Sequence, residues 1–393
     1  MADILSSFGK YLQVKETSAD NVVFKLFSKG SVGIFLVSSL IVVATQYFGD
    51  PIICSFKSGV DGDLAKQHCW IHGSSHIPAE FRNELSKVDC ISKEEDEYDT
   101  LPDTAYYQWV VFVLVIQAGI FAIPYRIWKQ AEHGLIKEFN TGEVNKVLVL
   151  EDDAALHSAV KRYVRQFNSI LHHNNRYFAT FVLCEVFNIV VLYLNFWLTN
   201  AFLGYKFGNY GFAVLNYYGT DPHVVNSNQI VNPMCDLFPT KVSCNMKTVG
   251  DSGALQTHNG LCILSQNIVN EKIFLAIYFW YVFLMIVSGI YAFFRACTIL
   301  VPQLRERYMC SKIRGRHLNH CVRNILKHSY MGDWFVLMQI AKNVNPYFFR
   351  EFVMELARDI VKADSNGLDA DPSDRLILND DDENVEMNKI PKE

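Results

Sequence analysis

The stretch IFLAIYFWYVFLMIVSGIYAFF, residues 273–294, contains no charged side chain. Two further stretches, residues 30–49 and 104–125, are also uncharged, and in a fourth, residues 177–198, Glu185 is the only charged residue. An α-helix needs about 20 predominantly apolar residues to cross the hydrocarbon core of a bilayer. The sequence therefore predicts a mainly α membrane protein built on a bundle of four transmembrane helices.

We expect the spans at residues 30–48, 106–127, 177–199 and 273–301, with loops at residues 49–105, 128–176 and 200–272 between them. Residues 1–29 precede the first span. Residues 302–363 contain apolar side chains at helical spacing, among them Phe349, Phe352 and Leu356, which indicates a helical region. Residues 364–393 hold ten acidic and three basic side chains, a composition typical of a disordered tail.

The distribution of basic residues predicts the orientation, because Lys and Arg are retained on the cytoplasmic side of a membrane protein. Residues 302–330 hold seven basic side chains and one acidic side chain, whereas residues 49–105 hold five basic and twelve acidic ones. We therefore expect both termini and the loop at 128–176 in the cytoplasm, and the loops at 49–105 and 200–272 outside the cell. A multi-pass plasma-membrane protein has lipids as partners, and the net charge of -5 gives no indication of a nucleic-acid partner.

Six of the ten cysteines lie in the two expected outer loops. They are Cys54, Cys69, Cys90, Cys235, Cys244 and Cys262. An even number of cysteines in an oxidising compartment favours disulfides, although six of them allow 15 connectivities. The others, Cys184, Cys297, Cys310 and Cys321, are expected to remain thiols. The spacing around Cys310 and Cys321 fits no common zinc pattern, so we expect no metal and no other cofactor.

Two charged residues occur at matching depths in neighbouring spans. Glu185 lies about 12 Å into the third span and Arg295 about 9 Å into the fourth, both counted from the cytoplasmic side at 1.5 Å per residue. An ionised group in a span is costly unless it is paired or hydrated. The two residues are interpreted as an ion pair within one subunit, with a pore or interface role for Glu185 as the alternative. Asn188 and Asn195 are expected to donate hydrogen bonds to neighbouring helices.

Pro124 lies in the second span and lacks the backbone donor that a helix interior uses. It therefore predicts a bend there, either as a tolerated kink or as a gating hinge. At the other end of the same span, Tyr106, Tyr107 and Trp109 are expected at the outer interface of the membrane, where amphipathic rings are favoured.

The amino-terminal segment has a thin apolar face behind Asp3, made by Ile4, Leu5, Phe8 and Leu12. Such a helix either lies on the membrane surface or folds into a pore. In a pore, Asp3 and Ile4 would form the narrowest part, and a ring of acidic side chains would select cations. Asp50, just outside the first span, would raise the cation concentration at the outer mouth.

The motif Tyr106-Tyr107-Gln108-Trp109 resembles the YYQW signature of innexins, the gap-junction proteins of invertebrates. Other blocks resemble the same family in the same order: residues 49–52, 69–72, 184–185, 261–264, 267–272 and 332–334. The resemblance covers about residues 20 to 360. Insect-virus relatives of innexins share this pattern.

The resemblance implies a ring of about eight subunits with cyclic symmetry. It also implies nested disulfides between the outer loops, Cys54 with Cys262 and Cys69 with Cys244. Many innexins have two cysteines in each outer loop, so Cys90 and Cys235 are additional. Extending the nested order would pair these two residues with each other.

Three functions are compatible with this sequence. The first is a subunit of an intercellular gap-junction channel in which two rings dock, and the second is an undocked hemichannel that releases small metabolites. The third is an adhesion or scaffold protein without a pore. The chain contains no N-x-[ST] sequon, so no N-glycan would separate apposed rings, which favours docking. The sequence contains no P-loop, H-E-x-x-H or G-x-S-x-G motif, and we expect no enzymatic activity.

Overall fold

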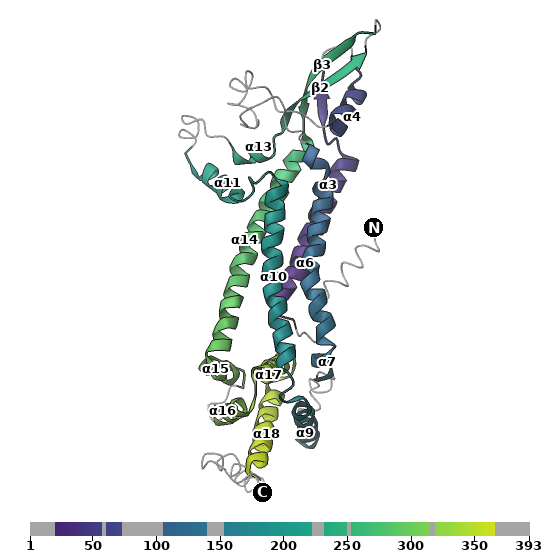
Figure 1. Cartoon of the computed structure of the whole chain (residues 1–393). Coiled ribbons are helices and arrows are strands. Elements are labelled where there is room, and N and C mark those ends of the chain that lie inside the picture. Colours follow the sequence, from purple (N-terminus) through teal and green to yellow (C-terminus); the bar gives the residue numbers. More distant parts are fainter. Residues whose placement is uncertain are drawn as a thin grey trace, which may run out of the picture. The chain divides into compact units, whose positions relative to one another are not determined.

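Four long helices in the computed structural model are apolar enough to cross a membrane (Figure 1). The first covers Val22–Phe48 and consists of α2 (Val22–Lys25), the π-helical segment η1 (Leu26–Ser31) and α3 (Val32–Phe48). The others are α6 (Val110–Glu132), α10 (Asn175–Phe202) and α14 (Ser265–Leu300). The structure describes residues 20–56, 60–72, 105–139, 153–221, 232–249, 253–313 and 319–365.

The four helices are longer than the spans expected from the sequence. The first begins at Val22 and contains Lys25 and Lys29, which had limited the uncharged run to residues 30–49. α14 begins at Ser265, eight residues before Ile273. Hydropathy identifies the part of a helix that a bilayer can cover, whereas backbone hydrogen bonding continues into the polar flanks. The segment predicted at 1–29 therefore includes the start of the first long helix.

The chain forms two compact units, and the division falls inside each of the four long helices. Unit 1 contains the described parts of residues 1–25, 124–187 and 289–393. Unit 2 contains those of residues 26–123 and 188–288.

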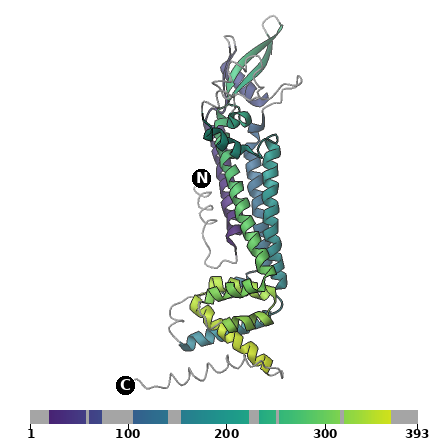
Figure 2. The same ribbon diagram turned by 90° about the vertical axis from the view of Figure 1, so that its left-hand side faces the viewer.

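Unit 2 contains the described parts of the two expected outer loops and a three-stranded antiparallel sheet. The first loop provides β1 (Ile53–Ser55), α4 (Gly62–His72) and the 3-10 turn η2 (Ala105–Gln108). The second provides α11 (Tyr210–Gly219), α13 (Pro233–Leu237), β2 (Lys241–Val249) and β3 (Leu255–Ile263). The strand order is β1-β3-β2, so β3 pairs with a strand from each loop. Figure 2 shows the β2–β3 hairpin extending beyond the helices of this unit.

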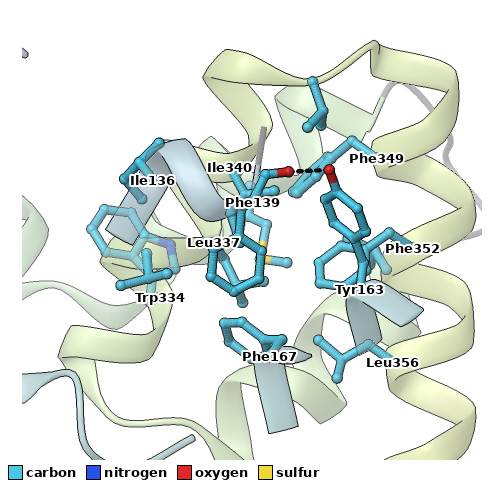
Figure 3. Close-up of a cluster of buried hydrophobic side chains, with 14 of the residues drawn as sticks. Ile136, Phe139, Tyr163, Phe167, Trp334, Leu337, Ile340, Phe349, Phe352 and Leu356 are labelled. Carbon is cyan, nitrogen blue, oxygen red and sulfur yellow. Dashed lines mark hydrogen bonds between the residues drawn. The ribbon is translucent and has the colours of Figure 1, made fainter. Parts of the chain in front are cut away.

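Unit 1 is a helical assembly around an aromatic core. Its shorter helices are α7 (Leu135–Phe139), α9 (Asp153–Ile170), α15 (Pro302–Ile313), α16 (Asn319–His328), α17 (Met331–Asn343) and α18 (Pro346–Ser365). The predicted face of α18 is confirmed, because Phe349, Phe352 and Leu356 are buried. Figure 3 shows these side chains gathered with Phe167 of α9 and Leu337 of α17. The Tyr163 hydroxyl donates a hydrogen bond to the Phe139 carbonyl oxygen, which ties α9 to the end of α7.

Candidate functional sites: the disulfide-linked loops and the buried ion pair

β3 is the central strand of the sheet in unit 2 and pairs with both β1 and β2. Cys54 of β1 and Val242 of β2 both lie opposite Cys262 of β3. In β2 the residues Val242, Cys244 and Met246 alternate with more exposed residues and are buried. This period of two is typical of a strand with one buried face. A strand from the first loop is thereby fixed to a hairpin of the second.

Two disulfides connect the same two loops covalently. Cys54 is bonded to Cys262, and Cys69 of α4 is bonded to Cys244 of β2. These are the two pairings that the family resemblance implies. Cys69, Cys244 and Cys262 are almost completely buried, in a small core with Ile52, Tyr107, Val242 and Leu264. A native disulfide typically contributes about 2 to 5 kcal/mol to the stability of a small domain.

The third expected bond involves a residue outside the described part of the chain. Cys235 in α13 is buried and disulfide-bonded. Its expected partner, Cys90, lies outside the described residues, so that pairing stays a prediction. The four cysteines expected to remain thiols, Cys184, Cys297, Cys310 and Cys321, form no disulfide.

The YYQW motif supports the linked loops from the start of α6. Tyr107 is completely buried, and its ring centroid lies 4.7 Å from that of Trp70 in α4. The Gln108 side-chain amide donates to the Trp70 carbonyl oxygen, and the Tyr106 hydroxyl donates to the carbonyl oxygen of Leu237, 3.4 Å away. The expectation of a membrane-interface position is therefore wrong for Tyr107, which packs inside the loop core. Trp109 is 60% exposed and remains available for that role.

The ion pair between Glu185 of α10 and Arg295 of α14 lies in unit 1. Arg295 donates from Nε to Glu185 Oε2 over 2.8 Å and from Nη2 to Oε1 over 2.9 Å. The side chains are 14% and 16% exposed, Glu185 and Arg295 respectively. The guanidinium also lies over the rings of Phe181 and Phe335, at 5.2 and 5.5 Å from their centroids. A bidentate pair stacked on aromatic faces is a strong geometry for arginine.

Asn21 is a third member of this site that sequence reasoning missed. Its Nδ2 donates to Glu185 Oε1 over 2.9 Å. The preceding residue, Asp20, is buried, and its Oδ1 lies 3.1 Å from Lys129 Nζ of α6. The Lys342 ammonium of α17 donates to the Asp20 backbone carbonyl. The residues that precede the first long helix are thus held by α6, α10 and α17 together.

A buried carboxylate, Asp333, lies at the start of α17 within the family block Gly332-Asp333-Trp334. Its Oδ2 accepts from the Tyr330 backbone amide over 2.9 Å, and its Oδ1 accepts from the His172 amide and the Asn174 side chain over 3.1 and 2.7 Å. A Cβ on Gly332 would lie 2.3 Å from the backbone of Asn174. Glycine is therefore required here so that α17 can approach the turn before α10.

Pro124 lies inside α6, and the helix continues on both sides of it. The Asn195 side chain donates to the Val191 carbonyl oxygen in its own helix, so the expectation that it would donate to a neighbouring helix is wrong. Its backbone carbonyl oxygen instead accepts from the Gln117 side chain of α6 over 3.3 Å. In unit 2 a hydrogen bond between neighbouring helices is donated by the Gln117 side chain of α6 to the Thr199 hydroxyl of α10 over 2.7 Å.

Asp50 forms an ion pair with Lys66, so the two opposite charges reduce each other's electrostatic potential at longer range. Asp3 and Ile4 lie outside the described residues.

Four long apolar helices and disulfide-linked loops define a four-span membrane protein whose two cysteine-bearing loops are bonded to each other. The family model described as Innexin matches residues 20–360. The chain is 32% identical over 365 residues to "Innexin inx2" of Drosophila melanogaster, covering 92% of this chain and 96% of that protein. It is 32% identical over 368 residues to "Innexin inx2" of Schistocerca americana, covering 92% and 98%. The chain belongs to the innexin family, whose members form the oligomeric channels of gap junctions.

Proposed function

We propose that this chain is a subunit of an intercellular channel in the plasma membrane at cell–cell junctions. A ring of about eight subunits with cyclic symmetry docks with an identical or related ring on the neighbouring cell. The joined pore passes ions and small solutes. Both termini lie in the cytoplasm, which the seven basic side chains of residues 302–330 support.

The observation that carries this proposal is the covalent joining of the two loops. Two rings dock efficiently only if their contact surfaces are ordered before they meet, because ordering on contact reduces affinity. The bonds Cys54–Cys262 and Cys69–Cys244 supply that order. Apolar side chains remain exposed on the sheet, including the directly paired Ile53 and Ile263 and the directly paired Val249 and Leu255. Exposed apolar pairs on a rigid sheet are suited to a protein–protein contact.

Dye transfer between paired cells, each expressing only this chain, tests the proposal. We expect transfer with the parent chain, loss of transfer with Cys69→Ser, and retention with Cys310→Ser, a thiol outside the sheet. Dye uptake by unpaired cells without transfer between pairs would replace the proposal with the undocked hemichannel. Cell adhesion without either dye signal would favour the scaffold function.

We also propose that the pore favours cations and that Asp3 contributes a ring of charge at its narrowest part. The support is the apolar face that follows Asp3 in the sequence and the selectivity of acidic rings in other channels. Reversal potentials under a salt gradient test this in the parent and in Asp3→Asn. Unchanged selectivity and conductance in the variant would favour a membrane-surface position for the amino-terminal helix.

A further inference from the structure

Helix α11 has a row of apolar side chains that the described part of the chain leaves more than half exposed. Phe212, Leu215 and Tyr218 are 57%, 55% and 65% exposed. They recur every third residue, which places them along one side of the helix. α11 also contains no charged residue. A short, uncharged helix with a row of exposed apolar and aromatic side chains requires a partner.

The first turn of α11 is fixed to α14 by contacts within unit 2, and the Phe212 ring centroid lies 5.8 Å from that of Tyr278. The Tyr210 hydroxyl donates to the Glu271 carbonyl oxygen over 3.1 Å, and the Tyr278 hydroxyl donates to the Gly208 carbonyl oxygen over 3.2 Å. A Cβ on Gly211 would lie 2.1 Å from the Tyr278 ring, so the α11 backbone rests directly on that ring. Figure 1 shows α11 beside α14 and turned across its direction. The position of α11 along α14 is therefore defined.

These contacts place α11 at the edge of the apolar part of α14. The uncharged run of α14 begins at Ile273, between the two anchoring positions Glu271 and Tyr278. At 1.5 Å per residue, the anchors lie within about 8 Å of the start of that run. The start of an uncharged run marks the boundary between hydrocarbon and headgroups. α11 is thus at the level of a membrane interface.

Two exposed aromatic residues precede α11 in the sequence. Trp197 lies five residues before the end of α10 and Tyr205 lies in the turn before α11, and both are exposed. Trp and Tyr are enriched at membrane interfaces because their rings are apolar and their polar atoms stay hydrated. Lys206, the basic residue of this turn, lies 3.7 Å from Asp236, so its charge is directed to the protein.

We propose that α11 is an interfacial helix whose Phe212, Leu215 and Tyr218 face inserts into the phospholipid leaflet around the Ser265 end of α14. The occupant is lipid rather than a second copy of the chain. Three side chains are too few for the roughly 800 Å² that each partner of a standard protein interface buries. Membrane-surface binding requires only that an apolar face enter the boundary between headgroups and acyl chains. The second loop, which continues through α13 into β2, would then be attached to the bilayer at α11.

Photo-crosslinking of the full-length protein in phosphatidylcholine nanodiscs tests this proposal. Phe212 or Leu215 is replaced by p-benzoylphenylalanine, and Lys247, exposed on β2, is replaced in the same way as the matched control. We expect both α11 positions to gain the mass of one phospholipid after irradiation, and position 247 to gain none. Covalent dimers in place of lipid adducts would assign the face to a neighbouring subunit and overturn the proposal.

Hydroxyl-radical footprinting keeps the proposal testable without any substitution. Leu215 of α11 and Leu255 of β3 are 55% and 66% exposed, so water would reach them to a similar extent in the absence of a membrane. In nanodiscs we expect Leu215 to be oxidised several-fold less than Leu255. Equal oxidation of the two leucines would place α11 in water and overturn the lipid assignment.

Discussion

The sheet of unit 2 and the helical assembly of unit 1 are stabilised by different chemistry. The sheet buries few large side chains, and disulfides connect its strands and α4. The helical assembly has an extensive aromatic core and contains the partly buried ion pair of Glu185 and Arg295 and the buried side chain of Asp333. A small apolar core supplies too little free energy to order long loops, so covalent bonds replace it. A large core can accommodate costly charges, provided that each has partners.

Removing one partner of the ion pair should have the largest effect. Arg295→Met leaves Glu185 as a partly buried carboxylate without its guanidinium, and Glu185→Gln leaves Arg295 uncompensated. We expect each to lower stability by about 3 to 5 kcal/mol, with a smaller loss in the double variant. Thermal unfolding in detergent, together with hydrogen exchange of unit 1 peptides, measures the loss of stability in the single variants and in the double variant. A double variant as damaged as the worse single variant would argue against coupling.

Removal of one disulfide should have the second-largest effect on stability, and this effect should appear in unit 2. Cys69→Ser is expected to cost about 2 to 4 kcal/mol and to increase hydrogen exchange in β2 and β3. The matched control Cys310→Ser, on α15 of unit 1, should leave the exchange of the sheet unchanged. A membrane-impermeant reductant should reproduce the effect of Cys69→Ser. Equal exchange in the sheet of the parent and of Cys69→Ser would show that the strands need no covalent support.

The carboxylate at the start of α17 should have an intermediate effect. Asp333→Asn replaces an acceptor of three hydrogen bonds by an amide that presents hydrogens to those donors. We expect a loss of about 1 to 3 kcal/mol, seen as faster exchange at the start of α17 and in the turn before α10. Asp153→Asn, at the exposed start of α9, is the control and should change stability by about 0.5 kcal/mol or less. Loss of the same size in both variants would contradict a special role for Asp333.

The smallest effect should depend on pH. Partial burial in α18 raises the pKa of Glu351, with Arg350 and His157 opposing this shift. Because the folded state holds this proton more tightly than the unfolded state, the contribution of Glu351 to stability falls as pH rises from its unfolded pKa through its raised folded pKa. Glu351→Gln should remove that pH dependence and stabilise unit 1 by about 0.5 kcal/mol near neutral pH. A parallel pH profile for parent and variant would contradict this.

The sequence predicted features that depend on local composition. The four apolar runs identified the four long helices, and the matching depths of Glu185 and Arg295 predicted their contact. The alternation of Val242, Cys244 and Met246 is a further local signal, typical of a strand with one buried face, and it lies in β2.

Other features depend on contacts between distant residues and left no local signal. Asn21 precedes an apolar run as any polar flanking residue does, and its partner Glu185 is 164 positions away. Asp333 is an ordinary first-turn acid until the turn before α10 reaches it. α11 has aromatic residues on both of its faces, since Tyr210 is buried and Phe212 is exposed. The hydrophobic pattern alone therefore did not separate its two faces.

The bond between Cys54 and Cys262 joins residues 208 positions apart. Two of the four long helices, α6 and α10, lie between them in the chain. At synthesis rates of about 5 to 20 residues per second, the Cys54 thiol waits roughly 10 to 40 s after it is made before its partner exists. During that interval the Cys54 thiol can form a disulfide with a cysteine that is made before Cys262, such as Cys69. The correct bond can therefore form only after both α6 and α10 have been made, which makes it a chemical mark of the order in which the chain is synthesised.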